Sequence, residues 1–468
     1  MKILVFVSDD KEFLKSIKVW RNLGVHITGI VPTRSLDEIK NVVDDCISEN
    51  NFVRSMFESE KQGKSQYINT FQKEYRIFCL TLDRMSFYCT PSMFSENLFN
   101  YFLEFALDFL RNNKFQRVVL GNVPHQVHSV AFQVAAKILK LDLYHRELPA
   151  IGSGLIALWF KNGSRIYTTN SVKISKIKDE ESKMSVIVNS INKISHGEDS
   201  SSRFHYMVDQ SKSRRLSRLK YTLYGLKFIG FIPWLILIMR KKEGFFNVPY
   251  LSQFGLFKPY PSIIALRKIF LQKKTTLDVF FKEYENLSSD IDSDVDYIYF
   301  PLHYQPEAST VPLGWPFHDQ IYVAHRLADS LPDGFKLVVK EHSTQFHLSY
   351  RGDRGRWSGY YKALSSHPKI LLAPISLDAD KIIDHSKGVV SVNGSTVLES
   401  GLRFKKPSVV LANDIYHGLS KIKYEGKIEN VFTLLSDIEN DNELDFDVYK
   451  FAEKKINIFF VNEVPNIK

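Results

Sequence analysis

Short apolar runs alternate with longer amphipathic stretches along most of this 468-residue chain. Such alternation is typical of strands and helices that follow one another in an open α/β sheet. In the first half the pattern predicts strands at 2–7, 26–31, 116–121 and 141–145, and helices at 11–23, 94–113 and 129–140.

A second α/β series begins near Asp296. The pattern predicts strands at 297–302, 336–342, 369–374, 388–393 and 407–412, and helices at 319–331, 357–366, 378–386 and 395–402. Because crossovers between parallel strands are right-handed, this order predicts a Rossmann-like parallel sheet. No repeat of fixed period is visible in the sequence.

The composition changes between the two series, where Ser, Lys, Asp and Glu dominate from about 172 to 220. We therefore expect a domain boundary there. The predicted organisation is an N-terminal Rossmann-like domain, a linker region, a C-terminal Rossmann-like domain and a final helix or tail, at 1–171, 172–295, 296–440 and 441–468.

The linker region contains a basic and aromatic segment at 203–243. The whole chain has 62 Lys and Arg against 52 Asp and Glu, a net charge of +10. Ten cations and two acids lie within this segment, so it alone carries +8. A nucleic-acid-binding protein more often spreads its cations along a groove, so we expect no nucleic-acid partner.

The apolar part of this segment, Phe228–Met239, has 12 residues and contains Pro233. Because a helix that crosses a bilayer needs about 20 apolar residues, we do not expect a transmembrane span. Cations on both sides of an apolar aromatic stretch favour a helix that lies on an anionic membrane surface. The alternative is a helix pair buried between domains with its cations extended into water. The expected membrane-surface residues are Arg214, Arg215, Arg218, Trp234, Lys241 and Lys242.

The remaining composition indicates a globular protein of a reducing compartment. Hydrophobic residues make up 44% of the chain, which excludes disorder for most of it. Three cysteines without a CxxC pair exclude a disulfide framework. The first residues, MKILVFVSDD, match a buried strand better than a signal peptide. We therefore expect a cytoplasmic location.

Polar residues directly follow three predicted strands of the second series, in the loops 299–314, 338–347 and 390–401. In parallel sheets, ligands bind beyond the carboxyl ends of the strands. The third loop, with Asn393-Gly394-Ser395-Thr396, gives the clearest physical reason. Its glycine lets the backbone approach a ligand, and Ser395 and Thr396 would cap a helix whose first N–H groups bind anions. An ordinary capped turn is the alternative.

The succession YFPLHYQPEAST, KLVVKEHS and VVSVNGSTVLESG resembles the capsular polysaccharide synthesis family. This family includes bacterial glycosyltransferases that use CMP-activated Kdo and related 2-keto sugars. The resemblance covers roughly 296–417. The loop at Asn122–His125 extends it loosely into the first half. One departure is Ser343, which stands where the family usually has Pro after K-E-H.

The resemblance implies a GT-B-like architecture, with two Rossmann-like domains whose parallel sheets face a central cleft. It also implies that the C-terminal domain binds the nucleotide sugar, with His342, Ser395 and Thr396 near the cytidine nucleotide and its phosphate. Glu399 lies where a carboxylate can bind a ribose diol. Together with the polar loop residues, the expected nucleotide-sugar-binding set is Gln305, Lys340, His342, Asn393, Gly394, Ser395, Thr396 and Glu399.

The implied reaction moves Kdo or a nonulosonic acid, such as pseudaminic or sialic acid, from a CMP donor to a capsular glycan or lipid-linked acceptor. We expect this to take place on the inner face of the bacterial inner membrane. The reaction needs a carboxylate and N–H or cationic donors, and since CMP leaves as a monophosphate we expect no metal and no cofactor. The candidate catalytic groups are Glu147, His125 and Glu307.

Other interpretations differ in class. Asp378-Ala379-Asp380 has the D-x-D form of metal-dependent transferases, but Asp at the start of a helix is a good N-cap. His125 and His128 could share a metal, although no third ligand is near in sequence. P-loop, G-x-G-x-x-G and G-x-S-x-G motifs are absent from the sequence. Two rival functions remain, a GT-B-fold nucleotide-sugar epimerase or hydrolase and a non-catalytic capsule-assembly partner.

Overall fold

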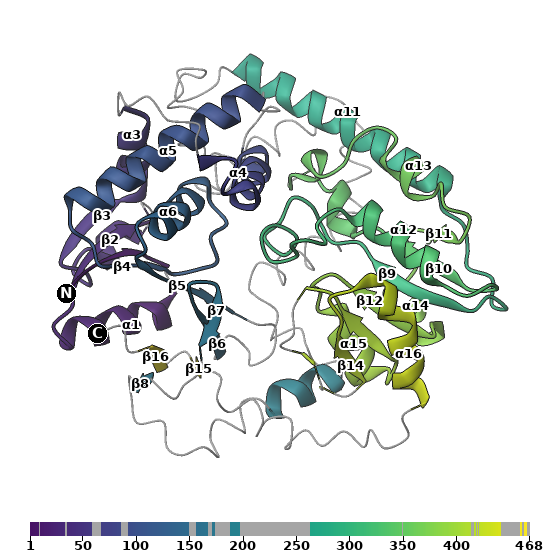
Figure 1. Cartoon of the computed structure of the whole chain (residues 1–468). Helices are drawn as coiled ribbons and strands as arrows, with labels where there is room; N and C mark the ends of the chain where they lie inside the picture. Colours follow the sequence, from purple (N-terminus) through teal and green to yellow (C-terminus); the bar gives the residue numbers. More distant parts are fainter. Residues whose placement is uncertain are drawn as a thin grey trace.

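The computed structural model consists of two lobes, each built on one sheet (Figure 1). The structure describes residues 1–8, 10–32, 35–58, 67–85, 92–148, 156–166, 171–173, 188–196, 263–348, 350–412, 416–417, 419, 421–440, 459–460 and 463–465. The membrane-surface residues expected within 203–243 lie outside the described residues.

The N-lobe contains a sheet with the strand order β15-β6-β5-β4-β1-β2-β3, with β7 paired to β6. The strands from β3 to β5 are parallel, whereas β6 runs antiparallel to β5. The elements are β1 (Lys2–Phe6), α1 (Lys11–Asn22), β2 (His26–Val31), α2 (Leu36–Ile39), β3 (Asp45–Ser48), α3 (Glu49–Glu58), α4 (Gln72–Met85), α5 (Ser92–Asn112), β4 (Arg117–Leu120), α6 (Val127–Ile138), β5 (Asp142–Glu147), β6 (Ile156–Lys161) and β7 (Ser164–Ile166).

The C-lobe contains six strands in the order β11-β10-β9-β12-β13-β14, all parallel. Its elements are α11 (Ile263–Leu287), β9 (Tyr297–Pro301), α12 (Gln320–Ser330), β10 (Lys336–Lys340), η4 (Ser343–Phe346), η5 (Gly352–Arg354), α13 (Tyr360–Leu364), β11 (Ile370–Leu372), α14 (Ala379–His385), β12 (Gly388–Ser391), α15 (Thr396–Arg403), β13 (Ser408–Val410), β14 (Ile422–Tyr424), η6 (Ile428–Asn430) and α16 (Val431–Asn440).

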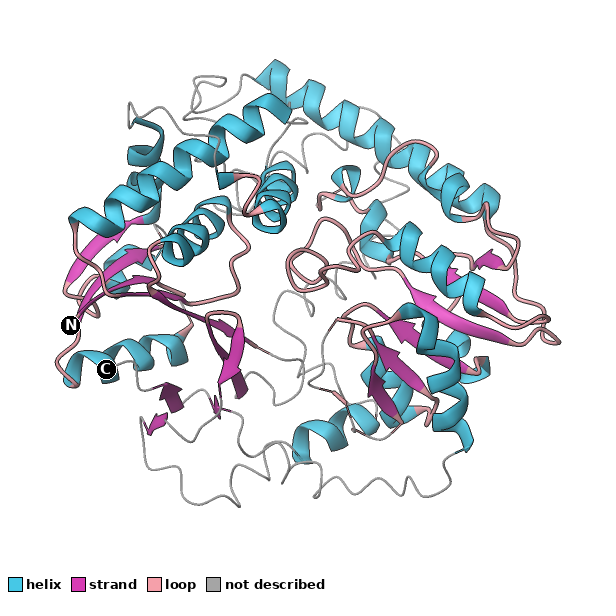
Figure 2. Cartoon of the chain, in the orientation of Figure 1, coloured by secondary structure: helices cyan, strands magenta, loops and turns pink. Residues whose placement is uncertain are grey.

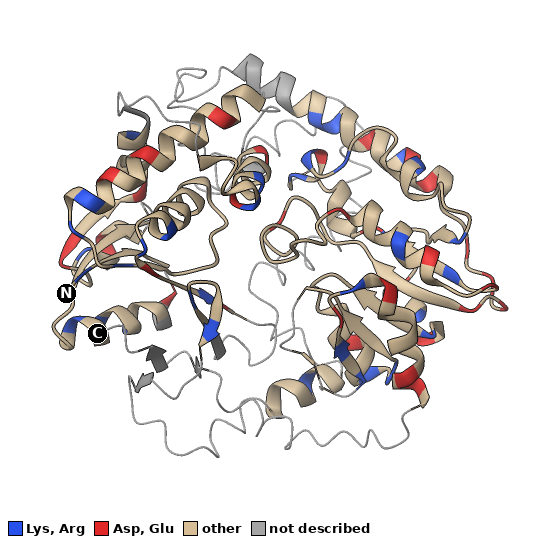
Figure 3. Ribbon diagram, in the orientation of Figure 1, with Lys and Arg blue, Asp and Glu red and all other residues tan. Residues whose placement is uncertain are grey.

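Helices cover both faces of each sheet (Figure 2), and alternate side chains of the strands explain why. In β1, Ile3 and Val5 pack with residues of α1, while Leu4 and Phe6 pack with α3 to α6 on the other face. The strands are mostly free of charge, whereas Lys, Arg, Asp and Glu line the outer helices (Figure 3). The predicted α/β class with two Rossmann-like, parallel-dominated sheets in a GT-B-like arrangement is confirmed.

The lobes meet through apolar contacts in two places. Val311 and Trp315, from the loop between β9 and α12, pack against the core of the N-lobe that contains α4 and α5. Elsewhere Leu158 of β6 joins a core cluster with the helical segment 188–195 and residues of the C-lobe sheet. The predicted boundaries at 171 and 295 stay a prediction.

The segment 441–468, expected as a helix or tail, contains short strands where it is described. The strand β15 (Phe459–Phe460) pairs antiparallel with β6, and β16 (Glu463–Pro465) pairs with β8 (Ser171–Lys173). This late part of the chain therefore returns to the N-lobe after the C-lobe is complete.

Candidate functional site

The two central strands of the C-lobe bring the first and third predicted loops together. Strands β9 and β12 are neighbours in the sheet, with Val389 opposite Tyr299. The chain winds outward from β9 to β11 and then returns to place β12 on the other side of β9. This reversal is the topological switch point, where open α/β sheets bind ligands at the carboxyl ends of their strands.

His303 follows β9 at this switch point and contacts the loop after β12. Its Nε2 accepts a hydrogen bond from the Asn393 backbone N–H at 3.2 Å and lies 3.2 Å from the Ser391 hydroxyl. Because Nε2 accepts, the neutral ring carries its proton on Nδ1. Among the described residues no hydrogen bond to Nδ1 is present, so this N–H is able to donate to a ligand. His303, Ser391, Asn393 and Gly394 are called the strand-end site below.

Burial and the nearby Arg356 guanidinium lower the pKa of His303 to about 4. The imidazole is therefore neutral at pH 7. Its backbone is fixed as well, since its N–H donates to Gln320 Oε1 at 2.6 Å and its carbonyl accepts from Gln320 Nε2 at 3.2 Å. The strand-end site is thus a neutral, positioned donor rather than a mobile cation.

Gly394 is the residue that the close approach of these loops requires. A Cβ atom at this position would lie 2.8 Å from Ser391 Oγ and 3.2 Å from His303 Cε1. A side chain added here would force the Ser391 hydroxyl to move, and the His303 imidazole would have to give by a few tenths of an ångström. The glycine therefore keeps the backbone beside His303 accessible, as expected from the sequence.

Helix α15 begins directly after this glycine. Ser395 is its N-cap residue, but its side chain makes no capping hydrogen bond, and it is exposed. The expectation that Ser395 and Thr396 cap this helix through their side chains is therefore wrong, because the N-cap residue already has helical backbone angles. Glu399 lies in the first turn, half-buried, and its charge contributes to raising the pKa of the buried Tyr299.

In the second predicted loop, Glu341 and His342 form hydrogen bonds and an ion pair within the protein. Glu341, which follows β10, forms a fully buried ion pair with Arg356, at 2.7 Å from Nε to Oε2. Oε1 of Glu341 accepts from the His342 N–H at 2.7 Å. His342 Nδ1 in turn accepts from the Thr344 N–H at 3.2 Å and so caps η4. Lys340, the last residue of β10, is half-buried.

Arg356 also holds the first loop. It donates to Gln305 Oε1 at 2.7 Å and to the His303 carbonyl at 3.2 Å. The Gln305 amide donates to the His318 carbonyl at 2.9 Å. The polar groups of the Gln305 side chain are therefore used within the protein, and its main contribution is to fix the loop between β9 and α12.

A cavity of ≈ 300 Å³ lies between the lobes. Helix α4 supplies the N-lobe wall, and the loop between β9 and α12 together with residues 354–360 supplies the C-lobe wall. Glu307 and Gln305 both line it. Gln305, two residues after His303, and Gln320, which bonds the His303 backbone, both line this inter-lobe cavity.

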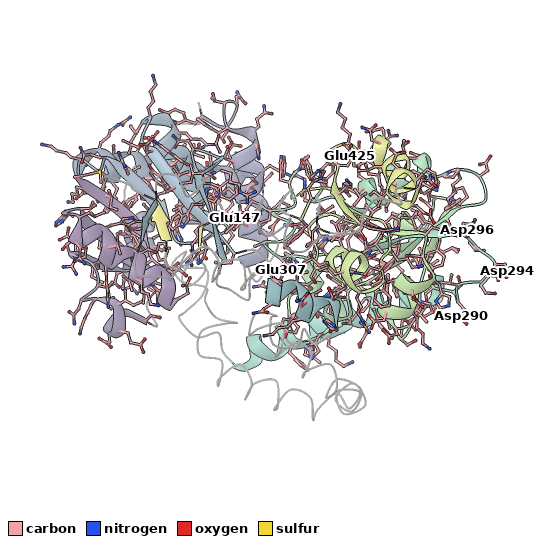
Figure 4. All side chains as sticks on the ribbon, turned by 90° about the horizontal axis from the view of Figure 1, so that it is seen from below. Glu147, Asp290, Asp294, Asp296, Glu307 and Glu425 are labelled. Carbon is pink, nitrogen blue, oxygen red and sulfur yellow. The ribbon has the colours of Figure 1, made fainter. Side chains whose placement is uncertain are left out.

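Of the catalytic candidates in the N-lobe, Glu147 is the last residue of β5 and His125 lies in the loop after β4. Glu147 Oε1 is 3.5 Å from His145 Nε2, whereas Arg146 turns away to pair with Asp10. Glu147 and Glu307 lie on the sides of the two lobes that face each other, while Asp290, Asp294 and Asp296 lie at the outer edge of the C-lobe (Figure 4).

His125 and His128 are close but differ in role. His125 Nδ1 lies 2.7 Å from the Val123 carbonyl in the loop after β4. His128 is buried, stacks on Phe6 and lies 3.5 Å from Glu49 Oε1. Burial, with His125 as a second cause, lowers the pKa of His128 to about 3. Within the described part of the chain no group of three His, Cys, Asp or Glu side chains could hold a metal ion.

The D-x-D sequence at Asp378 is a helix start. The Asp378 carboxylate accepts from the Asp380 N–H at 3.1 Å, and Asp380 pairs with Arg403 at 2.6 Å. The N-cap interpretation of Asp378 is therefore confirmed. Among the helices of the described residues, none combines the length and the apolar character that crossing a bilayer requires.

Several residues of this arrangement were not singled out from the sequence. His303 lies in the first predicted loop, but a histidine after a strand is common and gave no separate signal. Arg356 lies between a loop and a short helix, and only the fold shows that it pairs with Glu341. Ser391 is wholly buried at the end of β12, where its position alone suggested packing.

No protein-family profile and no curated protein matches this sequence. Similar solved structures include the UDP-GlcNAc 2-epimerase from Methanocaldococcus jannaschii, 10% identical over 97% of this chain and 98% of that chain, with a TM-score of 0.26. The Thermosulfurimonas dismutans KpsC, a beta Kdo 2,7 transferase, is 9% identical over 76% and 85%, with a TM-score of 0.28. The calicheamicin glycosyltransferase CalG4 is 11% identical over 97% and 92%, with a TM-score of 0.24.

Proposed function

We propose that this protein is a glycosyltransferase that moves an acidic 2-keto sugar, Kdo or a nonulosonic acid, from a CMP donor to a bacterial surface glycan. The observation that supports it most is the strand-end site. It combines a glycine that keeps the backbone open, a neutral His303 with an Nδ1–H donor, and the start of α15 at one switch point.

These groups suit a nucleoside monophosphate. The first N–H groups of a helix have no partner within it, and their dipoles attract anions. His303 adds a donor without adding a charge that would need its own counterion. Because CMP leaves with a single phosphate, N–H donors can accept its charge, and the proposed reaction uses no metal.

The sugar ring develops positive charge as CMP leaves, so a carboxylate nearby would stabilise the transition state. Glu307 is our first candidate, because it lines the inter-lobe cavity and follows His303 in the same loop. Its Oε2 accepts from the Ser309 hydroxyl at 2.8 Å, which orients the carboxylate. Glu147 and His125, on the N-lobe, remain candidates for the proton transfer from the acceptor hydroxyl.

A lipid-linked acceptor would bring the enzyme to the inner leaflet of the bacterial membrane. The basic segment 203–243 carries a net charge of +8, which would attract anionic lipids. Deletion of 212–243 is expected to reduce binding of the full chain to anionic vesicles. Unchanged folding together with unchanged vesicle binding would remove this part of the proposal.

The direct experiment is the thermal stability of the whole protein with CMP, UDP and GDP, without metal and then with Mg²⁺. A ligand at 100 times its dissociation constant stabilises the folded state by about 2.7 kcal/mol. We expect a shift with CMP that does not depend on metal. A shift with UDP instead would favour the epimerase, and CMP binding without turnover on any acceptor would favour the assembly partner.

A further inference from the structure

The inter-lobe cavity has one strongly basic side, which the proposed nucleotide site does not use. Arg354 lines the cavity at the end of η5. Behind it, Lys273 of α11 and Arg354 approach the same carboxylate, each with a nitrogen 3.8 Å from an oxygen of Asp353. Lys273 is only 6% exposed, so a long cationic side chain from another helix is enclosed here.

Three basic side chains, Lys273, Arg351 and Arg354, surround the Asp353 carboxylate at this side. Burial, together with the charges of Arg351 and Arg354 and against the opposite effect of Asp353, lowers the pKa of Lys273 to about 7. The backbone of Arg351 is also held in place, because its main-chain N–H donates to the Tyr304 hydroxyl at 2.6 Å. An anion bound at Arg354 would stabilise all three of these cations.

The N-lobe presents a second guanidinium to the same cavity. Arg76 of α4 is exposed and lines the wall opposite Arg354. It is close enough to His318, across the lobe boundary, to contribute to the lowered pKa of that imidazole, for which burial is the main cause. Like charges on facing walls repel each other unless an anion lies between them.

The rest of the cavity suits a saccharide. Trp357 is 55% exposed at the wall, and its ring meets Tyr360 edge to face at 4.7 Å, so a broad apolar surface remains uncovered. Asp83, Glu307 and Asp319 offer carboxylate oxygens to hydroxyl groups. An aromatic face with a few fixed polar groups is typical of small-molecule sites.

We propose that the inter-lobe cavity binds an acidic saccharide, whose carboxylate or phosphate lies between Arg354 and Arg76 and whose ring packs on Trp357. This inference deepens the proposed function, because it names the chemistry of the second substrate region beside the strand-end site. The acidic group could belong to the end of the acceptor glycan or to the sugar of the donor, and the two sources share this chemistry.

The test is calorimetric titration of the full chain with the methyl glycoside of N-acetylneuraminic acid and with the methyl ester of the same glycoside. The ester lacks the negative charge and differs otherwise only by one added methyl group. We expect the acid to bind at least about tenfold more tightly, as a charge-assisted hydrogen bond would give. Equal binding of acid and ester, or binding of neither, would overturn the inference.

Variants locate the binding. R354Q and R76Q are each expected to weaken binding of the acid by about ten- to a hundredfold and to leave the ester unchanged. R326Q is the matched control, since Arg326 is an exposed arginine on α12 paired with Glu429. Because Arg76 is on the surface, R76Q tests the inference even if R354Q fails to fold. Unchanged binding in R76Q, or equal weakening in R326Q, would contradict it.

A competition experiment shows whether the acidic group in the cavity belongs to the donor sugar or to the acceptor glycan. Displacement of the glycoside by a non-hydrolysable CMP-sugar analogue would assign the cavity to the donor sugar, and simultaneous binding would assign it to the acceptor. The cavity proposal and the proposed function can be tested separately, because one outcome overturns the CMP donor and leaves the cavity proposal standing. Retained, Arg354-dependent binding of the acid without any thermal shift by CMP would overturn the proposed donor and support the cavity as an acidic-saccharide site.

Discussion

The two lobes share the same order of their first five strands but differ in what lies at the switch point. In the N-lobe, Arg146 of β5 pairs with Asp10 after β1 and donates to the Gly121 carbonyl after β4 at 3.3 Å. In the C-lobe, the corresponding strand ends present the His303 imidazole and Gly394.

This difference shows how a common topology is specialised. The salt bridge of the N-lobe uses the polar groups at its strand ends for internal contacts. In the C-lobe the buried pair of Arg356 with Glu341 lies at the end of β10 and holds the loop after β9 through the His303 carbonyl. In the N-lobe the pair lies at the two central strands, β1 and β4, whereas in the C-lobe it lies beside β10 and the ends of β9 and β12 carry His303 and Gly394.

The largest expected effect comes from removing the arginine of each pair. R356M leaves Glu341 buried without its partner, and we expect it to lower the free energy of unfolding by about 3–5 kcal/mol. R146M should cost less, because the Asp10 side chain is 35% exposed and can be hydrated. Urea unfolding of both variants measures this.

The double variant E341Q/R356M is the control for the C-lobe pair. It should recover part of the loss, because no unpaired charge stays buried. A cost for R146M equal to or above that for R356M would contradict the comparison.

A second effect concerns the buried histidine of each lobe. The pKa values of His128 and His303, about 3 and 4, lie below the value of about 6.5 for an unfolded histidine. The unfolded chain therefore binds protons first as the pH falls, and stability decreases below pH 6.5. Each histidine should cost about 2 kcal/mol between pH 6.5 and pH 5.

The measurement is urea unfolding of the wild type, H128F and H303Q over this pH range. Each variant should show a shallower dependence on pH than the wild type. An unchanged slope in H128F would mean that His128 is not held neutral in the folded N-lobe.

The smallest expected effect on stability comes from replacing a glycine at the strand ends of each lobe, Gly394 or Gly121, with alanine. G394A should weaken CMP binding by about tenfold or more, because the new methyl group would displace the Ser391 hydroxyl and crowd the His303 imidazole, with about 1 kcal/mol lost in stability. G426A is the control, since its methyl group would meet only the tip of the exposed Tyr424. G121A should destabilise the N-lobe without changing CMP affinity, because its Cβ would lie 2.7 Å from the Ser8 backbone nitrogen. Equal CMP affinity in G394A and G426A would exclude the strand-end site.

The helices and strands that could be predicted from the sequence are those with a clear pattern of apolar and polar residues of their own. Strands such as β1 and β9 are continuous apolar runs, and their neighbouring helices have clear amphipathic patterns. Strand β3, with the sequence DCIS, and strand β14, with IKY, are short and partly polar, so their burial depends on neighbours far along the chain. Strands β6 and β7 run antiparallel to their neighbours, and their place in the sheet follows from this pairing rather than from a pattern of apolar residues in their own sequence.

The candidate site was predictable to the level of loops. The first and third loops do meet, because β9 and β12 are adjacent, but their contact runs through His303 and Ser391 rather than through the serine and threonine of the third loop. The basic side of the cavity joins α11 to residues 351–354, and no sequence pattern brings these segments together. The roles of Glu147, His125 and Glu307 stay predictions.

The pairing of β15 with β6 has a consequence for how the protein is made. Strand β7 covers the later part of β6, but Ile156 and Ala157 gain their partners only from residues 459–460, which are translated after the whole C-lobe. An exposed strand edge is a template for pairing with other chains. The N-lobe sheet therefore receives its last strand only when synthesis of the chain is almost finished.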